Sequence, residues 1–219
     1  MTDLSPVNLI ILLSLLGLLP FFLMMVTSYV KIVVVFSLIK NALGVQQVPP
    51  AMVLNGLAIV LTIFIMGPVG LEMGEIVESS GINLDASLSK PQEFSHLLTT
   101  AAPPLERFLK RNTDVRVSTA MKSTAKRLWP QKYHHLLDDD GFLLMLPSFV
   151  LTELTEAFQI GFLLYLPFIV IDLIISNILL AMGMMMVSPM TISLPFKLLL
   201  FVTLDGWLKI SQGLMYGYG

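Results

Sequence analysis

Two long stretches of this chain contain no charged side chain, and they limit what it can fold into. Residues 4–30 carry no Asp, Glu, Lys or Arg, and neither do residues 41–71. Only 13% of the 219 residues are charged and 55% are hydrophobic, whereas soluble domains carry roughly 25% charged residues. An apolar run of about 20 residues is long enough to cross a bilayer as a helix. The sequence therefore predicts an all-α, membrane-associated fold.

Four segments reach that length, near residues 6–30, 50–71, 157–181 and 190–212. The charges gather between them, because residues 72–140 hold 9 Lys or Arg and 10 Asp or Glu. The predicted organisation has three parts: an N-terminal hydrophobic helical hairpin at 1–71, a small polar and mostly helical domain at 72–140, and a C-terminal hydrophobic helical block at 141–219.

The basic residues between the first two apolar segments indicate an orientation. Among the short connections between apolar segments, only the first has an excess of positive charge, from Lys31 and Lys40. The positive-inside rule then puts this loop on the cytoplasmic side and the polar domain, with both termini, on the outer side. The first five residues contain no Lys or Arg. A cleavable signal peptide normally begins with positive charge, so we expect the first segment to be retained.

Glycines and prolines predict where several helices begin and end. Gly44, able to take a positive φ, ends the helix that precedes it. Pro50 or Ala51 begins the next helix, since a proline in the first turn costs nothing, and the run at 66–70 ends it. A further helix is expected to begin near Thr152, with a kink at Pro167.

Composition and motifs exclude several classes of function. The net charge of −2 gives no basic field for nucleic acid. The chain has no cysteine, hence no thiol nucleophile and no disulfide. Nucleotide-binding loops, zinc-protease motifs and nucleophile elbows are absent from the sequence. We expect no enzymatic activity and no cofactor. Asp138, Asp139 and Asp140 are interpreted as the N-terminal cap of a helix rather than as metal ligands.

A methionine-rich stretch lies between the last two apolar segments. Five of the 14 methionines fall between Met182 and Met190, and Pro189 and Pro195 prevent one uninterrupted helix there. Methionine is flexible and polarizable, so a cluster of it forms a deformable surface. Irregular backbone at membrane depth survives only where protein buries it or where it lines a cavity. Two interpretations follow: a deformable seal around a conduit, or a turn between helices that happens to be rich in methionine.

The charged residues of the last block are candidates for buried or intersubunit contacts. Asp172 lies inside an apolar segment, where an ionisable side chain rarely faces lipid. Lys197 and Lys209 are its candidate partners within the chain. Asp205 and Lys209 also have the i, i+4 spacing of a helical ion pair.

Several strings of this sequence resemble the FliP/SctR family of flagellar and type III secretion export gates. They are NALG at 41–44, LNGLA at 54–58, AFQIGF at 157–162, GMMMVSPMTISLPFK at 183–197 and DGW at 205–207. The short N-terminus resembles the virulence injectisome branch. The resemblance implies an inner-membrane protein whose assembled complex lies largely on the periplasmic side, which changes the simple four-span topology. It also implies broken helices at Pro20, Pro147, Pro167 and Pro189.

The resemblance further implies partners and site residues. The partners are other copies in a pentameric core, FliQ/SctS-type and FliR/SctT-type proteins, the SctU-type switch protein, the SctV-type export gate, the inner rod and transiting protein substrates. The family's methionine gasket falls on Met184, Met185 and Met186. The sequence thus predicts a pore-forming export-gate subunit for unfolded proteins. The alternatives are an ion-coupled small-solute transporter that uses Asp172, and a structural scaffold.

Overall fold

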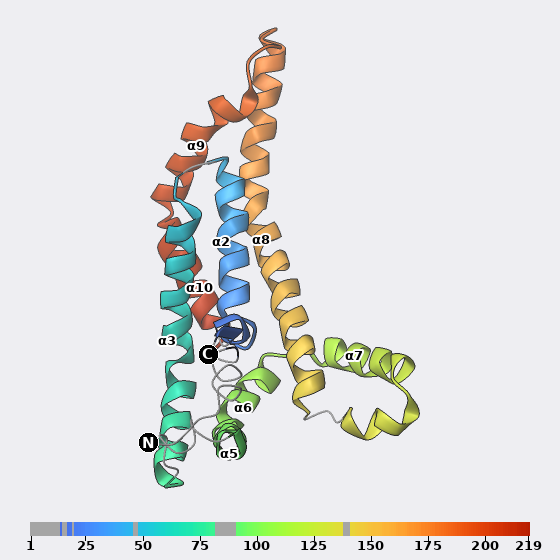
Figure 1. Ribbon diagram of the computed structural model, residues 1–219. Helices are drawn as coiled ribbons and strands as arrows, with labels where there is room; N and C mark the ends of the chain where they lie inside the picture. The colour runs from blue at the N-terminus through green and yellow to red at the C-terminus, as the bar shows by residue number, and fades with distance from the viewer. Residues whose placement is uncertain (1–13, 15–16, 19, 46–47, 82–90, 138–140) are drawn as a thin grey trace. The chain divides into compact units, whose positions relative to one another are not determined.

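A computed structural model describes residues 14, 17–18, 20–45, 48–81, 91–137 and 141–219 of the chain (Figure 1). Every regular element in these ranges is a helix, which confirms the predicted all-α fold. In chain order the helices are α2 (Tyr29–Leu43), α3 (Ala51–Ser79), α5 (Pro91–Ala101), α6 (Pro103–Arg111), α7 (Val115–Leu128), the 3₁₀ helix η1 (Gln131–Leu136), α8 (Phe142–Ala181), α9 (Pro189–Thr203) and α10 (Gly206–Tyr216).

The two longest helices are apolar enough to span a membrane, and α9 with α10 makes a third candidate that is bent by 58° at the break. At 1.5 Å per residue, the 40 residues of α8 extend about 60 Å, roughly twice the hydrocarbon thickness of a bilayer. Part of α8 must therefore lie outside the hydrocarbon region. The predicted segments 50–71, 157–181 and 190–212 correspond to α3, α8 and the bent pair. Of the segment 6–30, residues 14, 17–18 and 20–30 are described: residues 20–25 are helical, and residues 26–28 form a bend before α2 begins at Tyr29.

The chain forms two compact units, each built from two stretches of sequence. The first unit takes the described parts of residues 1–28 and 66–153, and the second takes those of 29–65 and 154–219. The second unit has its core on α2. Its buried apolar residues recur at three- and four-residue spacing, which is the period of one helical face: Ile32, Val35, Phe36, Ile39, Ala42 and Leu43.

Helices α2 and α8 approach closely in the second unit because of one glycine. A Cβ built on Gly161 of α8 would lie 2.2 Å from Cδ1 of Leu38 of α2, far inside contact distance. Glycine in a helix interior costs roughly 0.5–1 kcal/mol relative to alanine. The close packing of Leu38 on the bare helix backbone explains why that cost is tolerated here.

A sharp corner joins α9 to α10. Asp205 takes the left-handed conformation with φ 51° and ψ 45°, which Asp and Asn tolerate better than other residues with a side chain. Gly206 follows, and a Cβ there would lie 2.4 Å from the ring of Phe201. The corner lets Trp207 pack edge-on against Phe201 at 5.2 Å and against Phe36 of α2 at 5.8 Å between ring centroids.

The first unit contains the polar helices. Phe108 and Leu109 of α6 are buried, and Phe108 packs on Phe149 of α8 at a centroid distance of 5.9 Å. Asp114 caps α7, because its carboxylate accepts a hydrogen bond of 2.7 Å from the backbone N–H of Arg116. The exposed pair Arg107–Glu72 joins α6 to α3 at 2.6 Å.

Two predicted helix boundaries are wrong, and the first error concerns a proline. Helix α3 continues through Pro68 to Ser79 instead of ending at 66–70. Helix α8 begins at Phe142 rather than near Thr152, and it contains Pro167. In an apolar segment a broken helix would leave several backbone groups unsatisfied, and this outweighs the local penalty of proline. The boundaries at Gly44 and Ala51 are confirmed, and the φ of Gly44 is 76°.

The described ranges leave some predictions open. The division into parts at 1–71, 72–140 and 141–219 stays a prediction. The cap formed by Asp138, Asp139 and Asp140 lies outside the described residues, as does most of the chain before Pro20.

Candidate functional site

The methionine-rich turn lies between α8 and α9, and its start is built by a specific helix ending. The N–H of Gly183 donates to the carbonyl of Leu180 at 3.0 Å, and the N–H of Met184 donates to the carbonyl of Leu179 at 2.9 Å. With Gly183 at φ 72°, these two bonds form a Schellman motif, which satisfies the last carbonyls of the helix. Pro189 then begins α9 at its first position, where it needs no N–H partner.

The methionine side chains of this turn are exposed in the isolated chain. Met186 is fully exposed, Met185 is 82% exposed and Met184 is 42% exposed. Met182 and Met190, on the two flanks, are exposed as well. Methionine normally fills gaps in a core. Five exposed methionines on one turn therefore form a thioether surface that this chain by itself does not cover. We call residues 182–190 the methionine turn.

A polar node connects the two helices that flank this turn. The ammonium of Lys197 on α9 lies 2.6 Å from Oδ2 of Asp172 on α8. The hydroxyl of Ser193, one turn earlier on α9, donates to Oδ1 of the same carboxylate at 2.5 Å. Lys197 also donates to the backbone carbonyl of Ala42 at 3.0 Å. The three contacts hold α8, α9 and the last turn of α2 together in the second unit.

Burial differs between the members of the node. Ser193 is fully buried, and the side chain of Lys197 is 3% exposed, whereas that of Asp172 is 31% exposed. A buried ammonium is costly unless charge and hydrogen bonds compensate it. Lys197 receives both compensations, because it contacts a carboxylate and a carbonyl at the negative end of a helix. Both oxygens of Asp172 are engaged.

The other two predicted charges are placed differently. Asp205 sits at the exposed corner between α9 and α10, and its carbonyl accepts from the backbone N–H of Lys209 at 3.0 Å. Both side chains are exposed, and among the described residues they form no ion pair with each other. The structure thus brings Asp172 together with Lys197, and it does not bring Asp205 together with Lys209.

A second buried cation was missed by the sequence reading. Lys31 of α2 is 5% exposed and pairs with Glu156 of α8 at 2.7 Å, and its ammonium lies 4.3 Å above the ring centre of Tyr218. From the sequence, Lys31 served only to predict the orientation of the chain. The available signal was the position of Glu156 among apolar residues, where an ionisable side chain calls for a partner.

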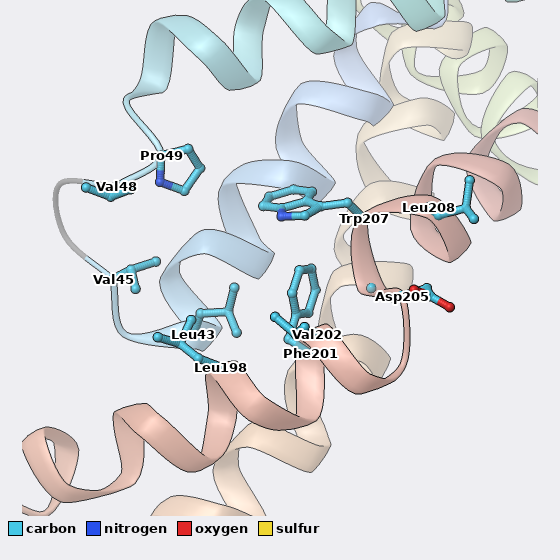
Figure 2. Close-up of a pocket in the computed structure, with 11 residues that line it drawn as sticks. Leu43, Val45, Val48, Pro49, Leu198, Phe201, Val202, Asp205, Trp207 and Leu208 are labelled. Atoms are coloured by element: carbon cyan, nitrogen blue, oxygen red, sulfur yellow. The ribbon is translucent and has the colours of Figure 1, made fainter.

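The second unit also has an apolar pocket of about 530 Å³ at the α9–α10 corner (Figure 2). Leu43 and Pro49 line it from the α2–α3 side, and Leu198 and Trp207 line it from the corner. Asp205 is the only ionisable residue among the described lining residues. The described residues contain no group of three His, Asp or Glu side chains that could hold a metal ion. The arrangement offers apolar contact and buried ion pairing.

Comparisons with known proteins identify relatives over nearly the whole chain. Residues 12–214 match the model of the FliP family. The chain is 52% identical over 213 residues to the Yop proteins translocation protein R of Yersinia pestis, covering 97% of this chain and 96% of that protein. It is 48% identical over 212 residues to the virulence protein YscR of Salmonella typhimurium, covering 95% of each chain. It is 47% identical over 211 residues to the hypersensitivity response secretion protein HrcR of Ralstonia nicotianae, covering 96% of each.

Proposed function

Because this chain belongs to the FliP family and its relatives are virulence-type translocation and secretion proteins, we propose that it is a pore-forming subunit of the type III secretion export gate. Its family and its long apolar helices indicate that it is an inner-membrane protein of the secretion machinery. The finer proposal is that it passes unfolded protein substrates across that membrane, and that the assembled complex lies largely on the periplasmic side.

The methionine turn carries this proposal. Met184, Met185 and Met186 are exposed on a turn whose backbone is fixed at both ends. Several copies around an axis would bring these side chains together into an apolar constriction. Such a constriction closes a pore to ions because it excludes water, and no binding chemistry is needed. Flexible thioethers can also move aside when a polypeptide passes.

The proposed assembly is a homo-oligomer, with a pentameric core as in the family. Its partners are FliQ/SctS-type and FliR/SctT-type membrane proteins, the SctU-type switch protein, the SctV-type export gate, the inner rod and the transiting substrates. The exposed apolar residues of α3, α8 and α9 supply surface for lipid and for such partners. The node at Asp172 and Lys197 is proposed to support the gate by fixing helices, with no part in moving protons.

Ion leak through the assembled gate tests the gasket. Met184, Met185 and Met186 are changed together to Ala, and in a matched control together to Leu, which keeps apolar volume. Both variants are co-expressed with the neighbouring apparatus proteins and reconstituted in liposomes. We expect equal assembly, ion leak for the Ala variant and a sealed pore for the Leu variant. A sealed Ala variant with normal assembly would refute the gasket role.

The ion-coupled transporter is the second candidate, since Asp172 is an ionisable residue of a long apolar helix and is partly exposed. Its test is solute uptake by cells that express the chain, with and without the Asp172→Asn change. Uptake that the change abolishes would favour the transporter. Engagement of both carboxylate oxygens by Ser193 and Lys197 counts against it, because a coupling ion would have to displace them.

A further inference from the structure

A second cleft in the second unit has polar side chains in an otherwise apolar lining, and neither the node nor the methionine turn uses these polar side chains. It has a volume of about 470 Å³ and lies where the end of α2 meets the starts of α3 and α9. Its described lining combines one cation, two amide side chains and apolar residues: Lys40, Asn41, Asn55, Val45, Leu54 and Met190. Of the described residues that line it, none carries a carboxylate.

Lys40 brings a positive charge to this cleft, and among the described residues no carboxylate pairs with it. Two other lysines of the same unit are paired, Lys31 with Glu156 and Lys197 with Asp172. The half-buried Lys40 has no such partner among the described residues. Lys40 also lies in the last turn of α2, where it offsets the negative end of that helix. Among the described residues, an anion would therefore displace no carboxylate from its ammonium.

Hydrogen-bond donors surround the same space. The side-chain amides of Asn41 and Asn55 line the cleft, and among the described residues neither makes a hydrogen bond. Ala51 and Met190 bring the first turns of α3 and α9 to the cleft, and the positive ends of these helices favour an anion. One cation and two amide groups suit the several acceptor oxygens of a phosphate group.

Apolar residues continue from the cleft along α3. Leu54 and Val45 line it, and Met52 and Val53 of the same helix turn are exposed by 84% and 57%. A free phosphate ion gains nothing from such surface, whereas a phospholipid buries its acyl chains on it. We propose that this cleft binds the phosphate group of an anionic phospholipid, with Lys40 as the cation and Asn41 and Asn55 as donors. Basic pockets between membrane helices bind anionic headgroups in this way.

Native mass spectrometry of the detergent-purified protein tests the proposal. Phosphatidylglycerol is titrated against phosphatidylcholine for the wild-type chain, for Lys40→Gln and for Asn55→Leu. Lys209→Gln is the matched control, because Lys209 is also an unpaired lysine of this unit among the described residues but lines no part of the cleft. We expect Lys40→Gln to weaken phosphatidylglycerol binding about fivefold, which is the contribution of one cationic side chain at an anionic surface.

The outcomes separate lipid from free anion. Lys209→Gln is expected to bind as the wild type does, and Asn55→Leu is expected to show a smaller loss than Lys40→Gln. Inorganic phosphate added in excess should leave the bound lipid in place. Unchanged binding by Lys40→Gln, or equal losses for both lysine variants, would overturn the site. Displacement of the lipid by inorganic phosphate, dependent on Lys40, would overturn the lipid as occupant and assign the cleft to a free phosphate ion.

Discussion

The node at Asp172 and Lys197 makes an asymmetric prediction about stability. Changing Asp172 to Asn leaves the ammonium of Lys197, 3% exposed, without its counter-charge and with the carbonyl of Ala42 as its remaining described partner. Breaking a buried ion pair by removing one partner costs about 3–5 kcal/mol. We expect about 3 kcal/mol for Asp172→Asn, at the low end because Asn retains a polar contact.

Changing Lys197 to Met should cost less. It leaves the carboxylate of Asp172, which is 31% exposed, able to take up water and to keep its bond from Ser193. We expect about 1–2 kcal/mol, because partial hydration reduces the desolvation penalty of the remaining charge. The double variant removes both charges and should cost less than the sum, with a coupling energy of about 1 kcal/mol or more.

Trp207 provides the assay. It packs between Phe36 and Phe201 in the core of the second unit, and in a Trp129→Phe background it is the only tryptophan. Unfolding of the detergent-solubilised protein followed by its fluorescence gives the free energy of each variant. Lys209→Met, at an exposed position, is the control and should change little. A larger loss for Lys197→Met than for Asp172→Asn would refute the burial argument, and additive single losses would refute the direct pair.

Three further predictions concern other parts of the chain. Gly161→Ala should destabilise the second unit by about 1–3 kcal/mol through overpacking, and Leu38→Ala should relieve part of that loss; no rescue in the double variant would contradict the contact. Gly183→Ala should lower the stability of the second unit by about 1–2 kcal/mol, because a φ of 72° strains a residue with a Cβ. Thermal unfolding measures this loss, with Gly70→Ala as the control because a Cβ at Gly70 would meet no close neighbour. The hydrogen bond from Arg116 lowers the pKa of Asp114 below its ordinary value of 3.8, so its stabilisation is present above that value and is lost as the pH falls through the lowered pKa. Asp114→Asn should therefore unfold earlier than the wild type near neutral pH and equally in strong acid, and a difference that persists in acid would count against the ion pair.

The sequence predicts the helical class and several boundaries because those features are local. A glycine can end a helix because it takes a positive φ without strain, and Gly44 does so with a φ of 76°. Proline within an apolar run does not behave locally, since continuation of the helix through Pro68 depends on the medium around it. A prediction based only on the hydrogen bond that proline cannot donate places the end of α3 too early.

In the candidate site, too, local features could be predicted from the sequence and long-range contacts could not. The methionine turn is visible in the sequence because five methionines lie within nine residues. The partner of Asp172 is not visible, since Lys197 and Lys209 satisfy the same chemical requirement. Lys197 pairs with it because the α9–α10 corner lies between these two lysines and the α8–α9 turn folds α9 back along α8. The contact from Lys197 to Ala42 joins residues 155 positions apart, and no spacing rule reaches that far.

The positions of the node and the methionine turn suggest how the two act together. Asp172 lies nine residues before the end of α8, and Ser193 lies four residues after the start of α9, distances of about 14 Å and 6 Å along the helices. The node therefore joins the two stems below the turn, while the methionines beyond it remain exposed. The proposed methionine gasket requires flexible side chains on a backbone that is held in place. In the proposed gate, the turn would supply the thioethers, the ion pair and the helix ending at Gly183 would hold their backbone in place, and the charges would act by position rather than by transport.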